Sequence, residues 1–432
     1  MLAAVATCVI LIPIVCIMIY RTICDGGIVI GKNIRFSNIF VREDDEKIKS
    51  FDLVKVAAGA LLFRIFIYLV SYLMMVLVYN NEGTFLDWWT KWDAEAYKNI
   101  ALGGYAQDTL DGVAGLGDGV FRTLVFFPLY PLLAAGVNLI IGNVRIALLA
   151  TATICFVAAC VVLYMAVHHR YGKSVADKAV ILMAISPYAF YQGGMLPEST
   201  FLLVCSLCML FTFKKKWWLA GLMGILCALT RLQGVVIIAL IGLEWMRDAQ
   251  VLALIKNKEW GRFVKSLLNL PAVFMPLLGV VAYFGVNVYY TNDPFYFMKL
   301  QKAIWGHTYV HIPTGIEKLV NNLRIEDSIA IKYAVWIPEL LIFVFVVALL
   351  YYAVRKHSIG VSVYLLLYLI ISYSSDYVIS ATRYMSVSVA LFVVLAEMCE
   401  KRPAVYRMLV TASLMLQVIY MGCHLSGWHL VT

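Results

Sequence analysis

The first residues that could carry chemistry lie in the run 90–101, TKWDAEAYKNIA. On a helix, Asp93 and Tyr97 would share one face because they are four residues apart. A carboxylate beside the indole of Trp92, at a membrane surface, can gain the basicity that a general base needs. A structural interpretation is also open: Thr90 and Asp93 have the spacing of a capping box, in which Asp93 would only accept backbone hydrogen bonds.

Three further charged residues lie at the ends of apolar runs. Glu198 follows Pro197 and opens one run, Arg231 lies at the tip of a short apolar hairpin, and Arg383 occupies a comparable turn. A guanidinium fork is well suited to binding a phosphate. The alternatives are that Glu198 complements a helix dipole, that the arginines reach lipid headgroups, or that Arg383 pairs with Asp376.

A second polar stretch includes Gln301 and Trp305 and is rich in aromatic residues. Such a stretch is typical of an amphipathic helix at a membrane interface, where anchoring is a sufficient role. His307 and His311 lack the partner pattern of a helical zinc site, and the sequence contains no HExxH, Walker, GxGxxG or GxSxG motif. We therefore expect no metal site and no soluble-nucleotide chemistry.

The composition shows which elements must position these residues. Of 432 residues, 62% are hydrophobic and 14% are charged, and the mean hydropathy is +0.84. These values exclude an ordinary soluble domain, disorder and a disulfide-stapled module. The cysteines inside apolar runs are expected to be buried thiols: Cys155, Cys160, Cys205, Cys208 and Cys227. Apolar runs lie near 3–20, 54–79, 144–167, 176–194, 197–213, 216–230, 232–246, 267–290, 333–354, 358–376, 382–400 and 404–425.

The basic residues predict how these runs are oriented. If 124–141 lies flat along the interface, 23 of the 35 lysines and arginines gather on one face. The positive-inside rule then places that face in the cytoplasm and both termini outside. We expect an all-α polytopic membrane protein with about 12 spanning helices, within a range of about 11–13. Two long outer segments, 80–143 and 291–332, are where chemistry is expected.

The whole chain, 1–432, is expected to form a single membrane domain. Residues 1–52 would supply an additional helix, retained and not cleaved as a signal peptide, and a cytoplasmic linker. The segment 80–143 would be the catalytic loop, with interfacial helices. We expect the site to face the outside or a lumen, and favour a bacterial plasma membrane over the endoplasmic reticulum.

Several motifs, in this order, resemble the PIG-V family of mannosyltransferases, which includes proteins like GPI mannosyltransferase 2, within the GT-C class. The resemblance covers about 85–400 and rests on the following segments: Trp92-Asp93-Ala94 with Tyr97 and Gly104-Tyr105; FFPLYP at 126–131; Ser186-Pro187; Pro197-Glu198-Ser199; WWLAG at 217–221; Leu229-Thr230-Arg231; Asp293-Pro294; Gln301-Lys302-Ala303 with Trp305; and Arg383-Tyr384. The sequence departs from the family pattern before Glu198 and after Arg231, and the first helix is an addition.

The resemblance implies a GT-C-like fold and an inverting transfer of a sugar, usually mannose, from a polyprenyl- or dolichyl-phosphate carrier to a glycolipid or other cell-surface acceptor. Asp93 corresponds to the family's catalytic base. Arg231 and Arg383 would bind the donor phosphate without a metal ion. The remaining residues expected in the substrate pocket are Trp92, Tyr97, Tyr105, Glu198, Gln301, Trp305 and Tyr384.

Two alternatives remain open from the sequence. The donor sugar could be glucose, galactose or an aminosugar. The protein could also be a lipid flippase or transporter, which should carry charges deep in its spans, ideally in two related halves. Arg64 is the main charge within a span and no repeated half is evident, which favours an enzyme. No nucleic-acid partner is expected.

Overall fold

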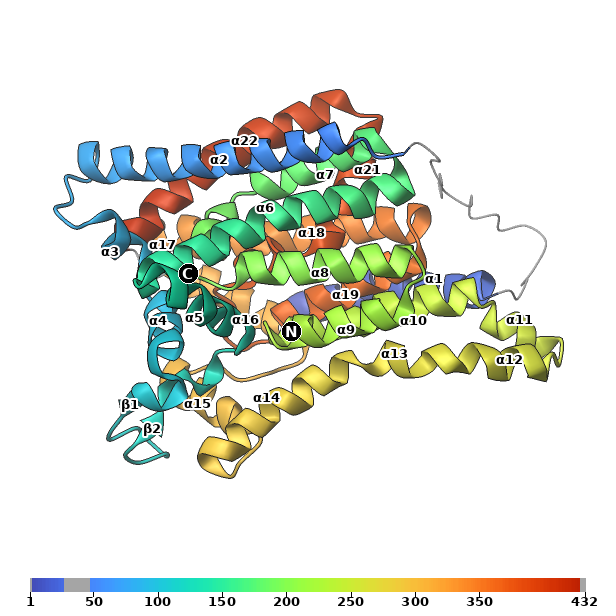
Figure 1. Cartoon of the computed structure of the whole chain (residues 1–432), viewed down its shortest axis with the longest axis horizontal. Coiled ribbons are helices and arrows are strands. Elements are labelled where there is room, and N and C mark those ends of the chain that lie inside the picture. The colour runs from blue at the N-terminus through green and yellow to red at the C-terminus, as the bar shows by residue number, and fades with distance from the viewer. Residues whose placement is uncertain (1, 27–46, 428–432) are drawn as a thin grey trace.

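The structure is a computed structural model that describes residues 2–26 and 47–427, and in this part of the chain it is almost entirely helical (Figure 1). The only strands described are β1 (Thr109–Leu110) and β2 (Val120–Phe121), which pair antiparallel. The predicted cytoplasmic linker lies largely outside the described residues.

Six helical segments in the described part of the chain are long and apolar enough to cross a membrane. Two of them are interrupted, one by a 3₁₀ turn at 267–269 and one by a π-helical turn at 332–336. The segments are α1 (Leu2–Asp25), α2 (Ser50–Leu77), α6 (Val144–Tyr171), α12–α14 (Trp260–Ser266, Leu270–Phe274 and Pro276–Thr291), α17–α18 (Ile329–Ile331 and Ile337–Lys356) and α22 (Pro403–Leu425).

Shorter helices fill the other predicted apolar runs. The 16-residue helix α8, for example, is about 24 Å long, whereas the hydrocarbon core of a bilayer is about 30 Å thick. The count of about 12 spans therefore remains a prediction. These shorter helices are α7 (Lys173–Ala184), α8 (Glu198–Phe213), α9 (Trp217–Ala228), α10 (Ile237–Asp248), α19 (Ile359–Tyr373), α20 (Ala381–Met385) and α21 (Val389–Glu400). The short helix α11 (Val251–Lys256) follows α10 outside the predicted runs.

The two predicted outer segments form short helices at one end of the bundle. In Figure 1, α4 lies across the ends of the long helices. On α5, Leu139 and Ile140 are each 89% exposed, as expected for a helix that lies against lipid. The elements are α3 (Phe85–Trp89), α4 (Asp93–Gly103), α5 (Leu129–Ile141), α15 (Tyr296–Trp305) and α16 (Ile312–Ile325), with 3₁₀ turns at 105–107 and 122–125. Two further 3₁₀ turns, at 189–193 and 232–236, join helices of the bundle.

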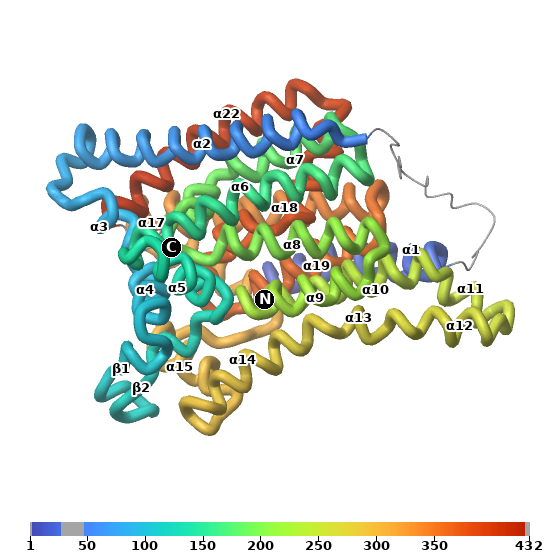
Figure 2. Tube along the Cα trace, in the orientation of Figure 1, coloured from blue at the N-terminus to red at the C-terminus, as the bar shows by residue number. Residues whose placement is uncertain are grey.

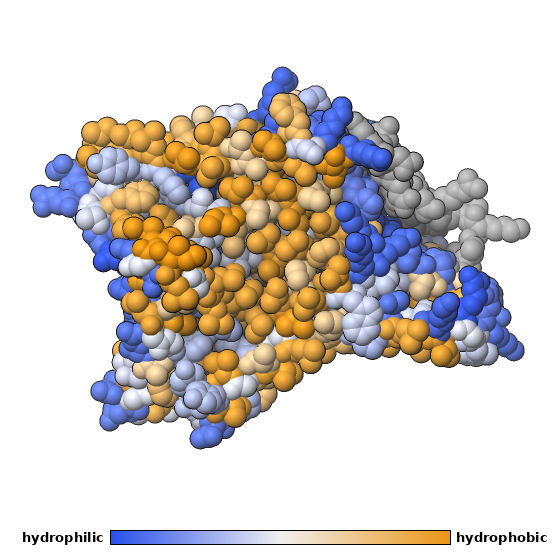
Figure 3. Space-filling model, viewed as in Figure 1, coloured by the Kyte–Doolittle hydropathy of each residue, from blue (hydrophilic) through white to orange (hydrophobic). Residues whose placement is uncertain are grey.

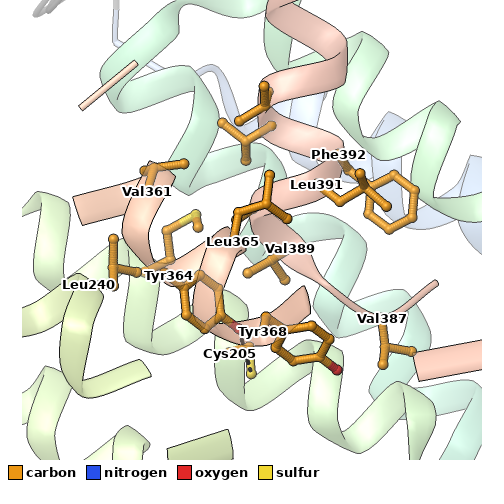
Figure 4. Packing of buried hydrophobic residues seen from close by; sticks show 14 of the residues in the cluster. Cys205, Leu240, Val361, Tyr364, Leu365, Tyr368, Val387, Val389, Leu391 and Phe392 are labelled. Carbon is orange, nitrogen blue, oxygen red and sulfur yellow. Dashed lines mark hydrogen bonds between the residues drawn. The ribbon is translucent and has the colours of Figure 1, made fainter. Parts of the chain in front are cut away.

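The core lies where α6, α7, α8, α10, α19 and α21 pack together. Figure 4 shows Tyr364 and Tyr368 of α19 among residues from three other segments, and the Tyr364 hydroxyl donates to Cys205 Sγ at 3.9 Å. The five cysteines predicted to be buried are buried. In Figure 2, the traces of α2 and α22, far apart in sequence, run side by side.

The surface agrees with a membrane protein. On the face shown in Figure 3, hydrophobic side chains form a broad belt across the middle, and hydrophilic side chains gather at both ends of the long helices. Arg64 is fully buried within α2, its guanidinium lies 4.0 Å from the ring centroid of Phe156, and no hydrogen-bond partner for it is found among the described residues.

Candidate active site

Four charged side chains meet at the end of the bundle where the outer segments lie. Glu198 Oε1 accepts hydrogen bonds from Arg231 Nη1 at 2.7 Å and from Arg383 Nε at 2.6 Å. Arg383 Nη1 also donates to Asp93 Oδ2 at 2.8 Å. The two arginines therefore lie side by side around one carboxylate oxygen, and Asp93 is held at the edge of this group.

The burial of the four side chains is graded. Glu198 is fully buried, the side chains of Arg383 and Arg231 are 7% and 10% exposed, and that of Asp93 is 33% exposed. Because a buried ion is unfavourable unless it is paired, the fold must bring the arginines to Glu198. Asp93 remains accessible, as a residue that acts on a substrate must be.

The helices fix each arginine from a different direction. Arg231 sits in extended backbone between α9 and the 232–236 turn, where Gly234 passes so close to Cys227 that a Cβ would lie 2.1 Å from its carbonyl oxygen. Arg383 lies on α20, whose start is held by buried Glu339, since this carboxylate accepts from the backbone N and the hydroxyl of Thr382.

Aromatic rings support both guanidinium groups. Arg231 Cζ lies 4.6 Å from the ring centroid of Tyr384, and Arg383 Cζ lies 4.7 Å from that of Tyr191. Such contacts stabilise a desolvated cation and orient its plane. The arginines are consequently fixed in position before any ligand binds.

The interpretation of Asp93 as a helix cap is wrong. The N-cap of α4 is Trp92, with φ 54°, and no side chain caps the helix. Thr90 donates instead to the Leu86 carbonyl, and the capping box forms one helix earlier, between Thr84 and Asp87. Asp93 therefore does not cap the helix, and its Oδ2 accepts a hydrogen bond from Arg383 Nη1.

The structural alternatives for the two arginines, contact with lipid headgroups and pairing of Arg383 with Asp376, are also wrong. Both side chains are almost fully buried and bind Glu198, so neither reaches out to lipid headgroups. Arg383 does not pair with Asp376, which accepts from Thr308 and lies 3.7 Å from Lys318.

A pocket with a volume of ≈390 Å³ opens beside the charged group. This volume falls within the range of about 300–1,000 Å³ that is usual for ligand sites. Eight of the ten residues predicted for the site line it: Trp92, Asp93, Tyr97, Arg231, Gln301, Trp305, Arg383 and Tyr384.

The other two predicted residues lie outside the pocket. Glu198 is fully buried, binds the two arginines and does not line the pocket. Tyr105 packs against Tyr290, and its hydroxyl donates to the Phe126 carbonyl at 2.7 Å, which holds an aromatic pocket residue in place. Both were expected in the substrate pocket, and neither is among the residues that line it in this structure.

The sequence did not reveal several residues of the site. Tyr191 and Ser375 have no motif around them. Glu339 had a usable signal, because it is a carboxylate inside an otherwise apolar run. His307, considered only as a zinc ligand, lines the pocket, and its Nε2 lies 2.7 Å from Ser375 Oγ. Among the described residues, no group of three or more His, Cys, Asp or Glu side chains is placed to hold a metal ion.

A short backbone clasp joins the second outer segment to the loop that leads to Arg383. Val310 N donates to the Ser374 carbonyl at 3.2 Å, and Thr308 N donates to Asp376 Oδ1 at 2.7 Å. Burial lowers the pKa of His307 below its ordinary value and outweighs the attraction of Asp376. Burial acts to raise the pKa of Asp376, but the hydrogen bonds from Thr308 outweigh it and the pKa is lowered.

No protein-family model and no curated protein match the sequence. Solved structures that match include ArnT from Cupriavidus metallidurans bound to undecaprenyl phosphate, with 13% identity, a TM-score of 0.49, and coverage of 84% of this chain and 63% of that one.

A second match is the oligosaccharyltransferase AglB from Archaeoglobus fulgidus in complex with an inhibitory peptide and a dolichol-phosphate, with 13% identity, a TM-score of 0.42, and coverage of 88% and 56%. The same enzyme in complex with Zn and sulfate matches with 14% identity, a TM-score of 0.42, and coverage of 86% and 53%. The chain spans between 53% and 63% of the length of these proteins.

Proposed function

We propose that the protein is an inverting glycosyltransferase that moves a sugar from a polyprenyl- or dolichyl-phosphate carrier to an acceptor hydroxyl. The observation that carries the proposal is the position of one accessible carboxylate, Asp93, beside two preoriented arginines on the wall of one pocket. A transfer of this kind needs one base and one cationic site for a leaving phosphate, and the pocket provides both.

In the proposed reaction, Asp93 accepts the proton of the acceptor hydroxyl. The acceptor oxygen forms a bond to the anomeric carbon as the bond from that carbon to the phosphate oxygen breaks. The electron pair of the broken bond goes to the phosphate, whose negative charge rises by one. Attack from the side opposite to the leaving group inverts the configuration, and Arg231 and Arg383 stabilise the added charge.

Glu198 has a part in this reaction although it does not reach the pocket. It neutralises one of the two buried arginine charges, and the donor phosphate would supply the negative charge that balances the other. Asp93 accepts a hydrogen bond from Arg383 Nη1. A bound phosphate would therefore compete with Asp93 for that guanidinium group. Donor binding would then release the carboxylate to act as the base, which predicts that the donor binds before the acceptor.

The remaining pocket residues would bind the sugar and the acceptor. Tyr97 packs edge-on against Phe126 at a centroid distance of 5.1 Å, and Phe126 packs in the same way against Trp305 at 6.2 Å. An aromatic wall of this kind suits the apolar faces of a sugar ring, and Gln301 adds an amide for its hydroxyl groups.

The sequence resemblance to the PIG-V family makes mannose the favoured sugar and a glycolipid the favoured acceptor, with the pocket on the outer face of a bacterial plasma membrane. Glucose, galactose or an aminosugar remains the alternative. A flippase or transporter is disfavoured, because the charged residues of the pocket lie at one end of the bundle and Arg64, within the span α2, does not line it.

The proposal is tested by incubating the purified full-length protein with a panel of polyprenyl-phosphate sugars and measuring release of polyprenyl phosphate. We expect release from one sugar, most strongly from the mannose donor, and loss of that release in Arg231→Gln. Arg145→Gln is the matched control, since Arg145 forms an exposed ion pair with Asp87 outside the pocket. Equal release by the parent and Arg231→Gln would refute the assignment.

A further inference from the structure

A second cavity lies at the opposite end of the bundle from the candidate active site. Helix α8 begins at Glu198 beside the first pocket and ends at Phe213, which lines the second cavity. This cavity has a volume of ≈270 Å³ and lies among the ends of α6 and α10 and the turn between α8 and α9. Three consecutive lysines, Lys214–Lys216, form that turn.

The floor of the cavity is a buried ion-paired group. Arg170 Nη1 binds Glu244 Oε2 at 3.0 Å, and Arg247 Nη2 lies 2.6 Å from the same oxygen. The side chains of Arg170 and Glu244 are 7% and 2% exposed. Arg170 also lies over the ring of Phe213, with a centroid distance of 4.6 Å. One buried carboxylate between two arginines is the same arrangement that Glu198 makes at the other end.

The rim of the cavity supplies a cation that can change partners. Lys215 pairs with Asp248 at 2.6 Å, but its side chain is 59% exposed. An exposed pair of this kind contributes little to stability, so Lys215 can leave Asp248 for another anion at small cost. Lys215 and Gln250 both have left-handed backbone, with φ of 57° and 50°, and both line the cavity. Non-glycine residues are held in this region at a cost in free energy.

The charge of the lining favours an anion. Three permanent cations, Arg170, Lys215 and Arg247, face two carboxylates, Glu244 and Asp248. The neighbouring Lys214 and Lys216 increase the positive potential at the mouth of the cavity. Arginine forks and a mobile lysine are the groups that bind phosphate oxygens best.

We infer that this cavity binds a phosphate group, carried by an anionic phospholipid of the adjacent leaflet or by a soluble phosphate. Arg247 and Lys215 contact the phosphate oxygens, and the Arg170–Glu244 pair fixes Arg247 in position. The inference is independent of the glycosyltransferase activity, because it rests on a different cavity at the other end of the molecule.

The test uses native mass spectrometry of the purified full-length protein with added phosphatidylglycerol, phosphatidylcholine or inorganic phosphate. The parent should hold phosphatidylglycerol in preference to phosphatidylcholine. Arg247→Gln and Lys215→Gln should each weaken that binding about tenfold, since each removes a charged hydrogen bond. Arg262→Gln is the control, because Arg262 is exposed at the same end but lies outside the cavity.

The probes distinguish the two sources. Binding of phosphatidylglycerol assigns the site to lipid, and binding of inorganic phosphate alone assigns it to a soluble phosphate. The inference is overturned if the parent binds neither probe, or if both cavity variants bind like Arg262→Gln. Lys215 is exposed, so Lys215→Gln should fold normally, and an unchanged unfolding temperature would verify this.

Discussion

At the scale of single residues, Glu198 and Asp93 share Arg383 but have different surroundings. Glu198 is buried between two cations, whereas Asp93 is partly exposed in the pocket. The same chemical group is therefore expected to give different phenotypes at the two positions. Replacement of Glu198 should affect the fold, and replacement of Asp93 should affect the reaction.

Glu198→Gln would leave two buried guanidinium groups without their shared counter-charge. Removal of one partner from a buried pair commonly costs about 3–5 kcal/mol, so we expect a clear fall in the unfolding temperature. Thermal unfolding of the purified protein measures this. Glu95→Gln is the control, because Glu95 pairs with Lys98 near the surface and the pair should contribute less than about 1 kcal/mol. Equal unfolding temperatures for the two variants would contradict the prediction.

Asp93→Asn would remove the charge that accepts the proton while keeping the size of the side chain. The initial rate of sugar transfer should fall about 10²–10⁴-fold. Binding of polyprenyl phosphate should be unchanged or tighter, because the competitor for Arg383 loses its charge. Both quantities are measured on the same preparation.

Glu95→Gln again serves as the control for Asp93→Asn. It lies two residues away on another side of α4, so transfer should stay within a few-fold of the parent. If Asp93→Asn transfers sugar as fast as Glu95→Gln, Asp93 is not the base and the mechanism is wrong.

At the scale of elements, α9 and α14 approach through glycine. A Cβ on Gly279 would lie 2.4 Å from the Ile225 carbonyl oxygen, so Gly279→Ala should force the helices apart and cost about 1–3 kcal/mol. Because α9 leads directly to Arg231, transfer activity should fall as well. Unfolding temperature and initial rate are the measurements.

Gly285→Ala is the matched control on the same helix. Nothing lies within 4 Å of a Cβ at Gly285, and alanine favours a helix over glycine by up to about 1 kcal/mol. This variant should be as stable as the parent or slightly more so. Loss of stability in Gly285→Ala equal to that in Gly279→Ala would show that close packing is not the cause.

The clasp between 307–310 and 374–376 should weaken in acid. The pKa of His307 is lowered in the folded state, so the unfolded state binds more protons near pH 6. The contribution of the neutral histidine is complete above about pH 6.5 and is lost as the pH falls toward the folded-state pKa. The pKa of Asp376 is lowered, so the contribution of its carboxylate to stability is fully present above the ordinary pKa of an aspartate. That contribution is lost only at more acidic pH.

Hydrogen exchange of the Val310 amide tests this, with intrinsic rates corrected for pH. Protection should decrease between about pH 7.5 and 5.5 in the parent and change much less in His307→Asn, which cannot titrate. Equal loss of protection in both proteins would rule out His307 as the titrating group.

At the scale of the whole molecule, the two ends of the bundle differ in kind. One end carries the pocket and the short outer helices, and the other carries the lysine-rich turns. The positive-inside rule predicts that the second end faces the cytoplasm. Lys215→Cys and Gln107→Cys place a thiol at each end, in a parent whose own exposed cysteines, Cys8 and Cys16, are replaced by serine.

Labelling of intact cells with a membrane-impermeant maleimide should modify Gln107→Cys and spare Lys215→Cys. Permeabilised cells should label both and so control for accessibility of the thiol. Equal labelling of the two positions from outside would contradict the predicted topology.

The helical, apolar character of the chain, the positions of its apolar runs and the residue types that could do chemistry could all be predicted from the sequence alone. Hydrophobic content and helical periodicity are local properties of the sequence, so they can be recognised without knowledge of the fold. Asp93 became a candidate through the motif at 90–101, and Arg231 and Arg383 through their place in predicted outer turns and the resemblance to the PIG-V family.

Which charged residues pair with one another could not be predicted without the packed helices. Glu198 binds Arg231 and Arg383 across 33 and 185 residues, and Asp93 binds Arg383 across 290. No spacing rule relates positions so distant; the pairing follows from the need to neutralise charges that the packed helices exclude from water. For the same reason Glu198 was predicted in the pocket and lies beneath it, since the sequence could not show which carboxylate the arginines would cover.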